Sequence, residues 1–230
     1  MTTYIERPQA YSETSYPIAA RARWFAVTAV LAGGVLQLVE SLLEPEFSDS
    51  SARVDWWLTH SLQLQVSQAV GLLAVPFLIG MILTAYRLVR AESRRIAAVA
   101  ACVLVTAMVG LAMVHGIELA AHIAAVNGHP GAAAAILDLA HPGIPGVLGF
   151  AMFVPMAGLG NILLIVAMWR SSYIPRLAII PAIAFPVLDL ALSLGVAGHV
   201  ASVLTDAVIA WAVLTRYRRA VDTAAADGAH

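Results

Sequence analysis

The chain has 230 residues, of which 60% are hydrophobic and only 12% are charged, and its mean hydropathy is +0.83. A soluble domain carries roughly a quarter charged residues, so these charges are too few to cover a water-facing surface. The sequence therefore predicts an integral membrane protein. It carries no Gly-rich phosphate loop, internal repeat or nucleic-acid-binding pattern, and no nucleic-acid partner is expected.

Six apolar stretches are long enough to cross the membrane, which takes about 20 helical residues for about 30 Å of hydrocarbon. Their expected limits are 22–43, 62–87, 96–122, 144–169, 175–196 and 199–215. We expect an all-α fold, a bundle of six transmembrane helices over 22–217. An N-terminal tail at 1–21 and a C-terminal tail at 218–230 are both predicted to be cytoplasmic.

The arginines predict the orientation of this bundle. All 13 basic residues are arginines, and twelve of them lie before or at the start of the first stretch, after the last one, or in and directly beside two of the connections. Only Arg53 falls on the opposite side. The positive-inside rule makes the arginine-rich side cytoplasmic. The absence of lysine and the abundance of Ala, Val and Arg indicate a GC-rich bacterial source, so we expect a multi-pass protein of the bacterial cytoplasmic membrane.

The sharpest candidate site lies at the outer end of the third stretch, where His115, Glu118 and His122 are spaced i, i+3 and i+7. This spacing puts the three side chains on one face of a helix. A count along the helices places further potential ligands near the same level, namely Glu40, His60, His141 and His199. Imidazole and carboxylate are ligands of zinc and iron, so the set predicts a divalent transition-metal site. The spacing matches neither HExxH nor the paired ExxH of di-iron bundles, and a plain polar rim is the alternative.

Two acids lie deeper in the predicted bundle. Asp189 is 13 residues beyond Arg176 and Asp206 is seven residues beyond His199, which places both at one depth in the membrane. Ionisable residues inside a membrane are costly and usually mark a functional site. We expect the two carboxyls to face one another, with one of them protonated, unless each only bonds a neighbouring hydroxyl.

Other expectations follow from single residues. Trp56 and Trp57 suit an interfacial anchor or a short amphipathic helix. The Gly- and Pro-rich fourth stretch predicts a kinked helix that packs closely on its neighbours. The lone Cys102 has no disulfide partner and is expected to fill the core.

The segment Trp169-Arg170-Ser171 followed by Pro175-Arg176 resembles the cytoplasmic hinge of an uncharacterised family of bacterial six-helix membrane proteins. The resemblance covers the last third of the chain. It implies the topology and no activity.

Four functions remain open from the sequence. The first is a metal-dependent membrane enzyme acting on a lipid or another apolar small molecule, with Glu118 or an aspartate as acid or base. The second is a haem b electron-transfer protein, in which His60 and either His115 or His122 ligate the iron. The third is a metal-free acid/base enzyme of the terpenoid cyclase or isomerase type that uses Asp189 and Asp206. The fourth is a proton-coupled carrier, which the lack of an inverted repeat disfavours.

Overall fold

The computed structural model describes residues 20–45, 47, 49–138, 144–192 and 194–227, and within these ranges the chain is helical and forms no strand. The elements are α1 (Ala20–Leu43), α2 (Ser50–Thr59), α3 (Ser61–Val126), α4 (Pro130–Leu137), α5 (Ile144–Arg170), the 3₁₀-helix η2 (Arg176–Ala178), α6 (Ile179–Pro186), the π-helix η3 (Val187–Ala191) and α7 (Gly195–Asp227). The expected N-terminal tail up to residue 19 and the candidate ligand His141 lie outside the described residues.

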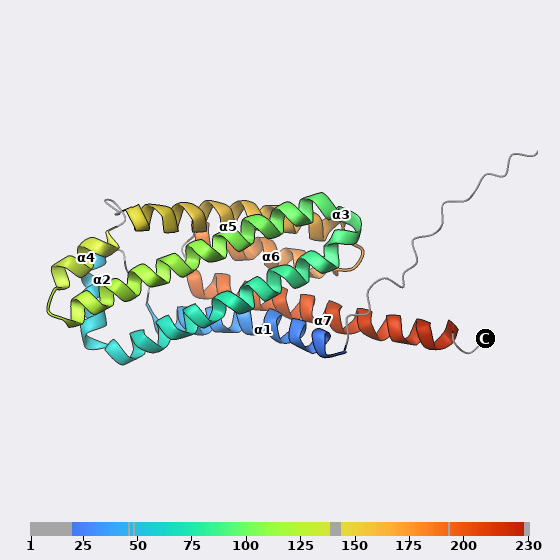
Figure 1. The fold of residues 1–230 in the computed structure, drawn as a ribbon, viewed down its shortest axis with the longest axis horizontal. Helices are drawn as coiled ribbons and strands as arrows, with labels where there is room; N and C mark the ends of the chain where they lie inside the picture. Colours follow the sequence, from blue (N-terminus) through green and yellow to red (C-terminus); the bar gives the residue numbers. More distant parts are fainter. Residues whose placement is uncertain (1–19, 46, 48, 139–143, 193, 228–230) are drawn as a thin grey trace, which may run out of the picture.

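Four helices of the described chain, α1, α3, α5 and α7, are long and apolar enough to cross a membrane. The longest, α3, has 66 residues and leaves helical geometry at Ser93, where φ is −139° and ψ is 44°. Figure 1 shows that the helix folds back at this point into two antiparallel limbs, residues 61–92 and 94–126. Helices of this length and apolar character suggest a membrane protein, in agreement with the composition.

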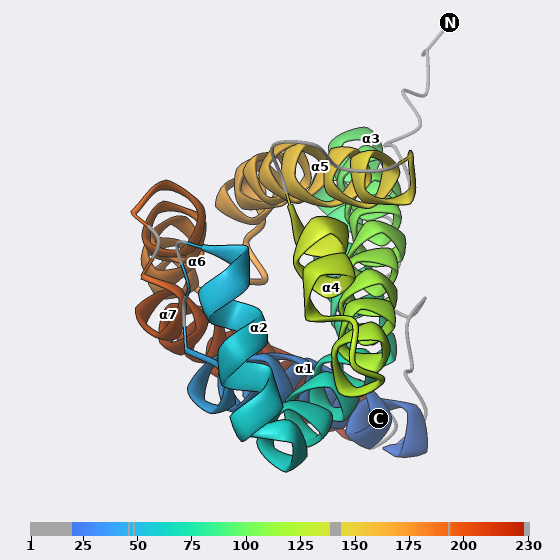
Figure 2. The same ribbon diagram turned by 90° about the vertical axis from the view of Figure 1, so that its left-hand side faces the viewer.

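The bundle is held by a continuous apolar core in which α3 packs on α1 and α5, α7 packs on α1, and α6 packs on α7 (Figures 1 and 2). Small residues bring α5 close to the second limb of α3. A Cβ on Gly110 would lie 2.6 Å from the backbone nitrogen of Phe153, and one on Gly160 would lie 2.6 Å from Cγ of Leu104. The predicted close packing of the Gly-rich stretch is therefore confirmed at Phe153 and Gly160.

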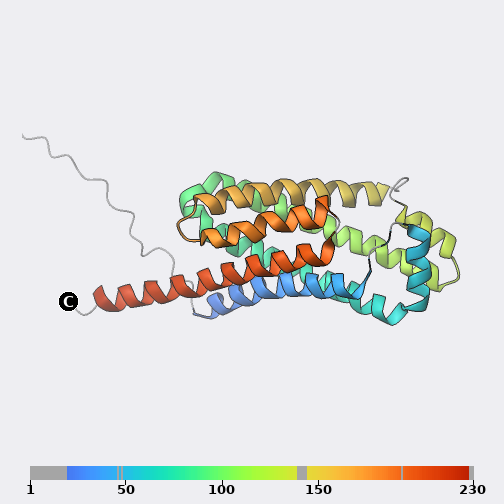
Figure 3. The ribbon, with the colours of Figure 1, turned by 180° about the vertical axis from the view of Figure 1, so that it is seen from behind.

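The two ends of the bundle differ in character. At one end lie the start of α1, the Ser93 bend and the connection from α5 to η2, all of which carry arginines; we call it the arginine end (Figures 1 and 3). Here Glu92 accepts hydrogen bonds from the backbone nitrogen and the hydroxyl of Ser172, both at 2.6 Å. These bonds tie the α3 bend to the α5–η2 connection.

The opposite end is covered by α2 and α4, which lie in front in Figure 2, and we call it the capped end. Asp49 caps the N-terminus of α2 by accepting a bond from the backbone nitrogen of Ala52 at 2.9 Å. Gly128, with φ of +85°, ends α3 and lets the chain turn back into α4. The expected short helix around Trp56 and Trp57 is present as α2, and Trp57 is fully buried in a small second core under the cap.

Two elements differ in detail from what the sequence predicts. The stretch 175–196 is divided into η2, α6 and η3, and α7 already begins at Gly195, inside the expected limits of this stretch. Pro186 has no N–H for the α-helical hydrogen-bond ladder, and the chain passes there from α-helix to π-helix. Cys102 is exposed on the outside of α3 instead of filling the core.

Candidate functional site

Six polar side chains lie close together at the capped end, on and beneath α2. Soluble proteins and membrane bundles alike normally place apolar residues at such buried positions. The six side chains come from the end of α1, from α2 and from both limbs of α3, and we call them the polar cluster: Glu40, Glu44, Arg53, Gln68, His115 and Glu118. Groups of this kind are rare inside membrane bundles and usually mark function.

Arg53 joins two carboxylates of the cluster. Its guanidinium lies 2.7 Å from Oε1 of Glu44 and 2.7 Å from Oε1 of Glu118, and the planar group stacks 5.0 Å from the ring centroid of Trp57. Burial by itself would lower the pKa of Arg53, but the two carboxylates outweigh it and raise this pKa above its ordinary value. Arg53 is therefore a fixed cation that ties α2 to α1 and to α3.

His115 lies between two carboxylates and is buried, with 4% of its side chain exposed. Its Nε2 is 3.5 Å from Oε1 of Glu40 and its Nδ1 is 3.6 Å from Oε2 of Glu118. These distances are too long for hydrogen bonds, and neither ring nitrogen has a hydrogen-bond partner among the described residues. Both carboxylates are nevertheless close enough to stabilise a charge on the imidazole ring.

The two carboxylates beside His115 are held differently. Glu118 accepts from Arg53 and also from Nε2 of Gln68 at 3.0 Å, so its position is fixed from two sides. Glu40 accepts from Nε2 of Gln37 at 2.9 Å, one turn away on its own helix. Glu118 therefore suits the role of an orienting group, and Glu40 is the less firmly held acid.

A glycine on the first limb of α3 provides the space in which Glu40 and His115 meet. A Cβ on Gly71 would overlap Oε1 of Glu40 and would lie 2.6 Å from Cε1 of His115. Any larger residue would drive the carboxylate and the imidazole apart. The cluster contains three carboxyls and one fixed cation, so protons on His115 or Glu40 can balance the remaining charge.

The structure brings together only part of the predicted metal-ligand set. Glu40, His115 and Glu118 share one site, whereas His122 lies two turns beyond His115, with its Nε2 3.3 Å from the hydroxyl of Ser61 and its ring edge-on to a tryptophan. His60 is exposed and stacks on a ring of α2 with 4.7 Å between the centroids.

The expected metal and haem arrangements are not formed by these groups. Among the described residues no set of three or more His, Cys, Asp or Glu side chains is arranged to hold a metal ion. Glu40 and Glu118 face different nitrogens of His115, so they cannot join it around one ion. The haem hypothesis needs His60 to face another histidine, but His115 faces carboxylates and His122 faces Ser61.

The expected pair of Asp189 and Asp206 is also not formed. Oδ1 of Asp189 lies 3.6 Å from Nδ1 of His199, and its Cβ packs against Gly198. The carboxyl of Asp206 packs against Gly34 of α1. Asp206 lies eight positions beyond Gly198 in α7, about 12 Å along the helix, because the chain turns back earlier than the sequence suggests.

Two members of the polar cluster, and the glycine beside it, do not follow from the sequence pattern alone. Glu44 and Gln68 look like ordinary polar residues near helix ends, and nothing in the sequence marks Gly71. Arg53 does carry a signal, since it is the one arginine that falls opposite the other twelve. A lone basic residue on the acidic side indicates a specific partner.

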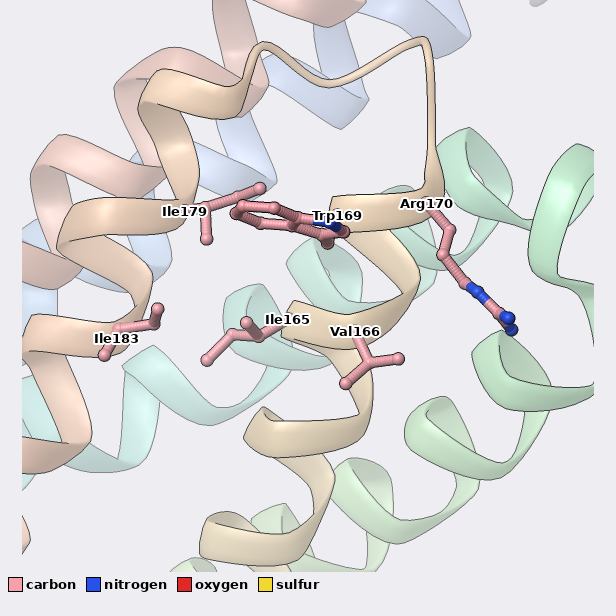
Figure 4. Close-up of a pocket in the computed structure, with 6 residues that line it drawn as sticks. All are labelled: Ile165, Val166, Trp169, Arg170, Ile179 and Ile183. Carbon is pink, nitrogen blue, oxygen red and sulfur yellow. The ribbon is translucent and has the colours of Figure 1, made fainter.

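A separate apolar groove lies between α5 and α6 at the arginine end, far from the polar cluster. It has a volume of about 250 Å³ and is lined by Ile165, Val166, Trp169, Arg170, Ile179 and Ile183 (Figure 4). The Trp169 ring lies beside Ile179, whereas the Arg170 guanidinium points away from both. The lining includes no acid, histidine or hydroxyl, so the groove carries no general acid, general base or nucleophile.

Comparison of the chain with protein-family models, with curated protein sequences and with solved structures finds no match. The resemblance of the 169–176 hinge to bacterial six-helix membrane proteins therefore stays a prediction.

Proposed function

We propose that the chain spans the bacterial cytoplasmic membrane six times, with the arginine end and both termini in the cytoplasm. Each limb of the 66-residue α3 exceeds the about 20 residues that a span requires. The fifth span is formed by η2, α6 and η3, and at 1.5 Å per residue it rises about 24 Å, which is less than the hydrocarbon thickness. The capped end then faces outward.

In this topology the protein is an acid/base enzyme that isomerises or cyclises a lipid or another apolar small molecule. The observation that carries the proposal is the position of His115, which is buried between Glu40 and Glu118 with both ring nitrogens open to new hydrogen bonds. A histidine within reach of two carboxylates can accept a proton at one position of a substrate and return a proton at another. Such a reaction needs no oxidant, reductant or leaving group.

The cluster suggests a role for each of its groups. Glu118, fixed by Arg53 and Gln68, orients His115 and stabilises its charged form. Glu40 faces the other ring nitrogen and serves as the second proton donor or acceptor. Gly71 leaves the room in which Glu40 and His115 approach one another, and the substrate would bind beside this pair.

The position of the cluster favours an enzyme over a carrier. A carrier must expose its site to both sides in turn, and its site lies near the midplane. The polar cluster lies at one end of the bundle, and the continuous apolar core fills the space between it and the arginine end. An enzyme working at the outer leaflet needs access from one side only.

The test uses the purified protein in vesicles made from a total lipid extract of the host. Wild type, His115→Gln and Gly71→Ala are incubated, and the apolar fraction is compared by mass spectrometry and chromatography. We expect wild type to convert one species into an isomer of equal mass and both variants to lose this conversion. The matched control is Gly116→Ala, beside His115 in the same helix, where an added Cβ meets nothing within 4 Å.

Two results would overturn the proposal. One is a wild type that leaves every apolar species unchanged. The other is collapse of a pH gradient across the vesicles that wild type causes and His115→Gln does not, because that result identifies a proton-coupled carrier.

A further inference from the structure

Asp206 is a second buried acid, distinct from the polar cluster. It lies on α7 with 2% of its surface exposed, and its carboxyl packs directly on Gly34 of α1, where an added Cβ would overlap Oδ2. Oδ2 has no hydrogen-bond partner and no exposed surface in the described part of the chain. The close approach of the two helices at Gly34 thus creates a compartment just large enough for this carboxyl.

A carboxylate in such a compartment has almost no contact with solvent, and no cation lies beside it in the described structure. Burying an unpaired charge is costly, and inside a membrane this cost is met by binding a proton. The neutral carboxylic acid can remain in an apolar compartment. Asp206 is therefore suited to hold a proton in the resting protein.

The compartment is closed toward the arginine end. One turn from Gly34 in that direction lies Val30, which is fully buried, and one turn from Asp206 along α7 lie Ile209 and Ala210, which are 1% and 4% exposed. All three belong to the continuous apolar core. The side chains next to the acid on this side offer no polar group to receive its proton.

Toward the capped end the surroundings are polar. Gln37 lies one turn beyond Gly34 on the same face of α1, and its amide donates to Glu40 of the polar cluster at 2.9 Å. From the level of Gly34 toward the capped end, the polar groups therefore follow in the order Gln37, Glu40 and His115.

We propose that Asp206 is a proton-binding site inside the bundle that exchanges its proton only with the capped end, past Gln37 and Glu40. The site needs no substrate and does not depend on the enzymatic role proposed for His115. Its chemical signature is a protonated carboxylic acid whose hydrogen exchanges with water more slowly than those of exposed groups.

Infrared spectroscopy of the protein in lipid vesicles at neutral pH tests the protonation. The spectrum of Asp206→Asn is subtracted from that of wild type, which removes the band of any other protonated acid, such as Glu40, and the difference should contain the carbonyl band of one protonated carboxylic acid. Asp189→Asn is the matched control, since this acid also packs on α7 but lies beside His199, and its difference spectrum should lack the band. A wild-type-minus-Asp206→Asn spectrum without the band overturns the proposal.

A chemical label gives a second readout that requires no variant. The O–H of a protonated carboxylic acid adds across one C=N bond of the apolar reagent dicyclohexylcarbodiimide, and the adduct rearranges to a stable N-acylurea with no leaving group. In wild-type protein the peptide containing Asp206 should gain the mass of one reagent molecule. Recovery of this peptide only in unmodified form counts against the site.

Deuterium exchange tests the direction of access. On transfer to D₂O the carbonyl band should shift, and Gln37→Leu should slow this shift by about tenfold, the effect of adding about 1.4 kcal/mol to the barrier. The control is Ser41→Ala, whose hydroxyl bonds only to a carbonyl of its own helix in the described structure. An unchanged rate in Gln37→Leu would show that the proton leaves by another path and would overturn this part of the proposal, whatever the fate of the enzymatic one.

Discussion

Replacing Arg53 by glutamine removes the one fixed cation of the polar cluster. In the wild type its Nε donates to Glu44 at 2.8 Å and its terminal nitrogen donates to Glu118 at 2.7 Å. The two carboxylates are 12% and 13% exposed, so water cannot replace the lost partner fully. The variant therefore keeps two buried acids whose charges are no longer compensated.

The size of the effect follows from this burial. Removing one partner of a buried ion pair costs about 3–5 kcal/mol. Because 26% of the Arg53 side chain is exposed, some screening by water persists and the lower value of about 3 kcal/mol applies. For a chain of this length each kcal/mol lowers Tm by about 2–4 °C, so the expected loss is about 6–12 °C.

Thermal unfolding followed by tryptophan fluorescence in detergent measures this shift. The control is Arg95→Gln, an exposed arginine at the opposite end of the bundle, which should change Tm by less than about 2 °C. Combining Arg53→Gln with Glu118→Gln should recover part of the loss, because one of the uncompensated charges is then removed. The reasoning fails if Arg53→Gln matches the control or if the second substitution adds its full cost to the first.

Two further outcomes concern the packing and the topology. Gly110→Ala should destabilise the protein by about 1–3 kcal/mol, because the new Cβ meets the backbone of α5. The control Gly158→Ala, whose Cβ meets nothing within 4 Å, should leave Tm unchanged or higher. Equal effects of the two substitutions would contradict the close packing of α5 on α3. In a background lacking the native cysteine, Asp55→Cys and Gly131→Cys at the capped end should react with an impermeant thiol reagent in intact cells. Ala91→Cys at the arginine end should be protected. Protection of both capped-end sites would refute the six-span orientation.

The candidate site was predictable in part. His115 and Glu118 are three residues apart in one helix, so their shared face follows from the helical repeat, and the level of Glu40 follows from counting residues along its span. Their predicted use as metal ligands with His122 did not follow, because His122 lies two turns further along and is held by Ser61. The helical repeat places residues on a face, but the neighbouring helix decides which of them meet.

The sequence by itself determined the class of protein: too few charges for a soluble surface, apolar stretches of spanning length and arginines gathered on one side. These properties are sums over local composition and need no knowledge of packing. The tertiary structure decided which distant groups touch, including Arg53 on Glu118, Gly71 beside the acid and imidazole, and Asp206 on Gly34. Each of these contacts depends on how two helices are rotated and on where the chain turns back, and a shift of the last turn by a few residues was enough to separate Asp189 from Asp206.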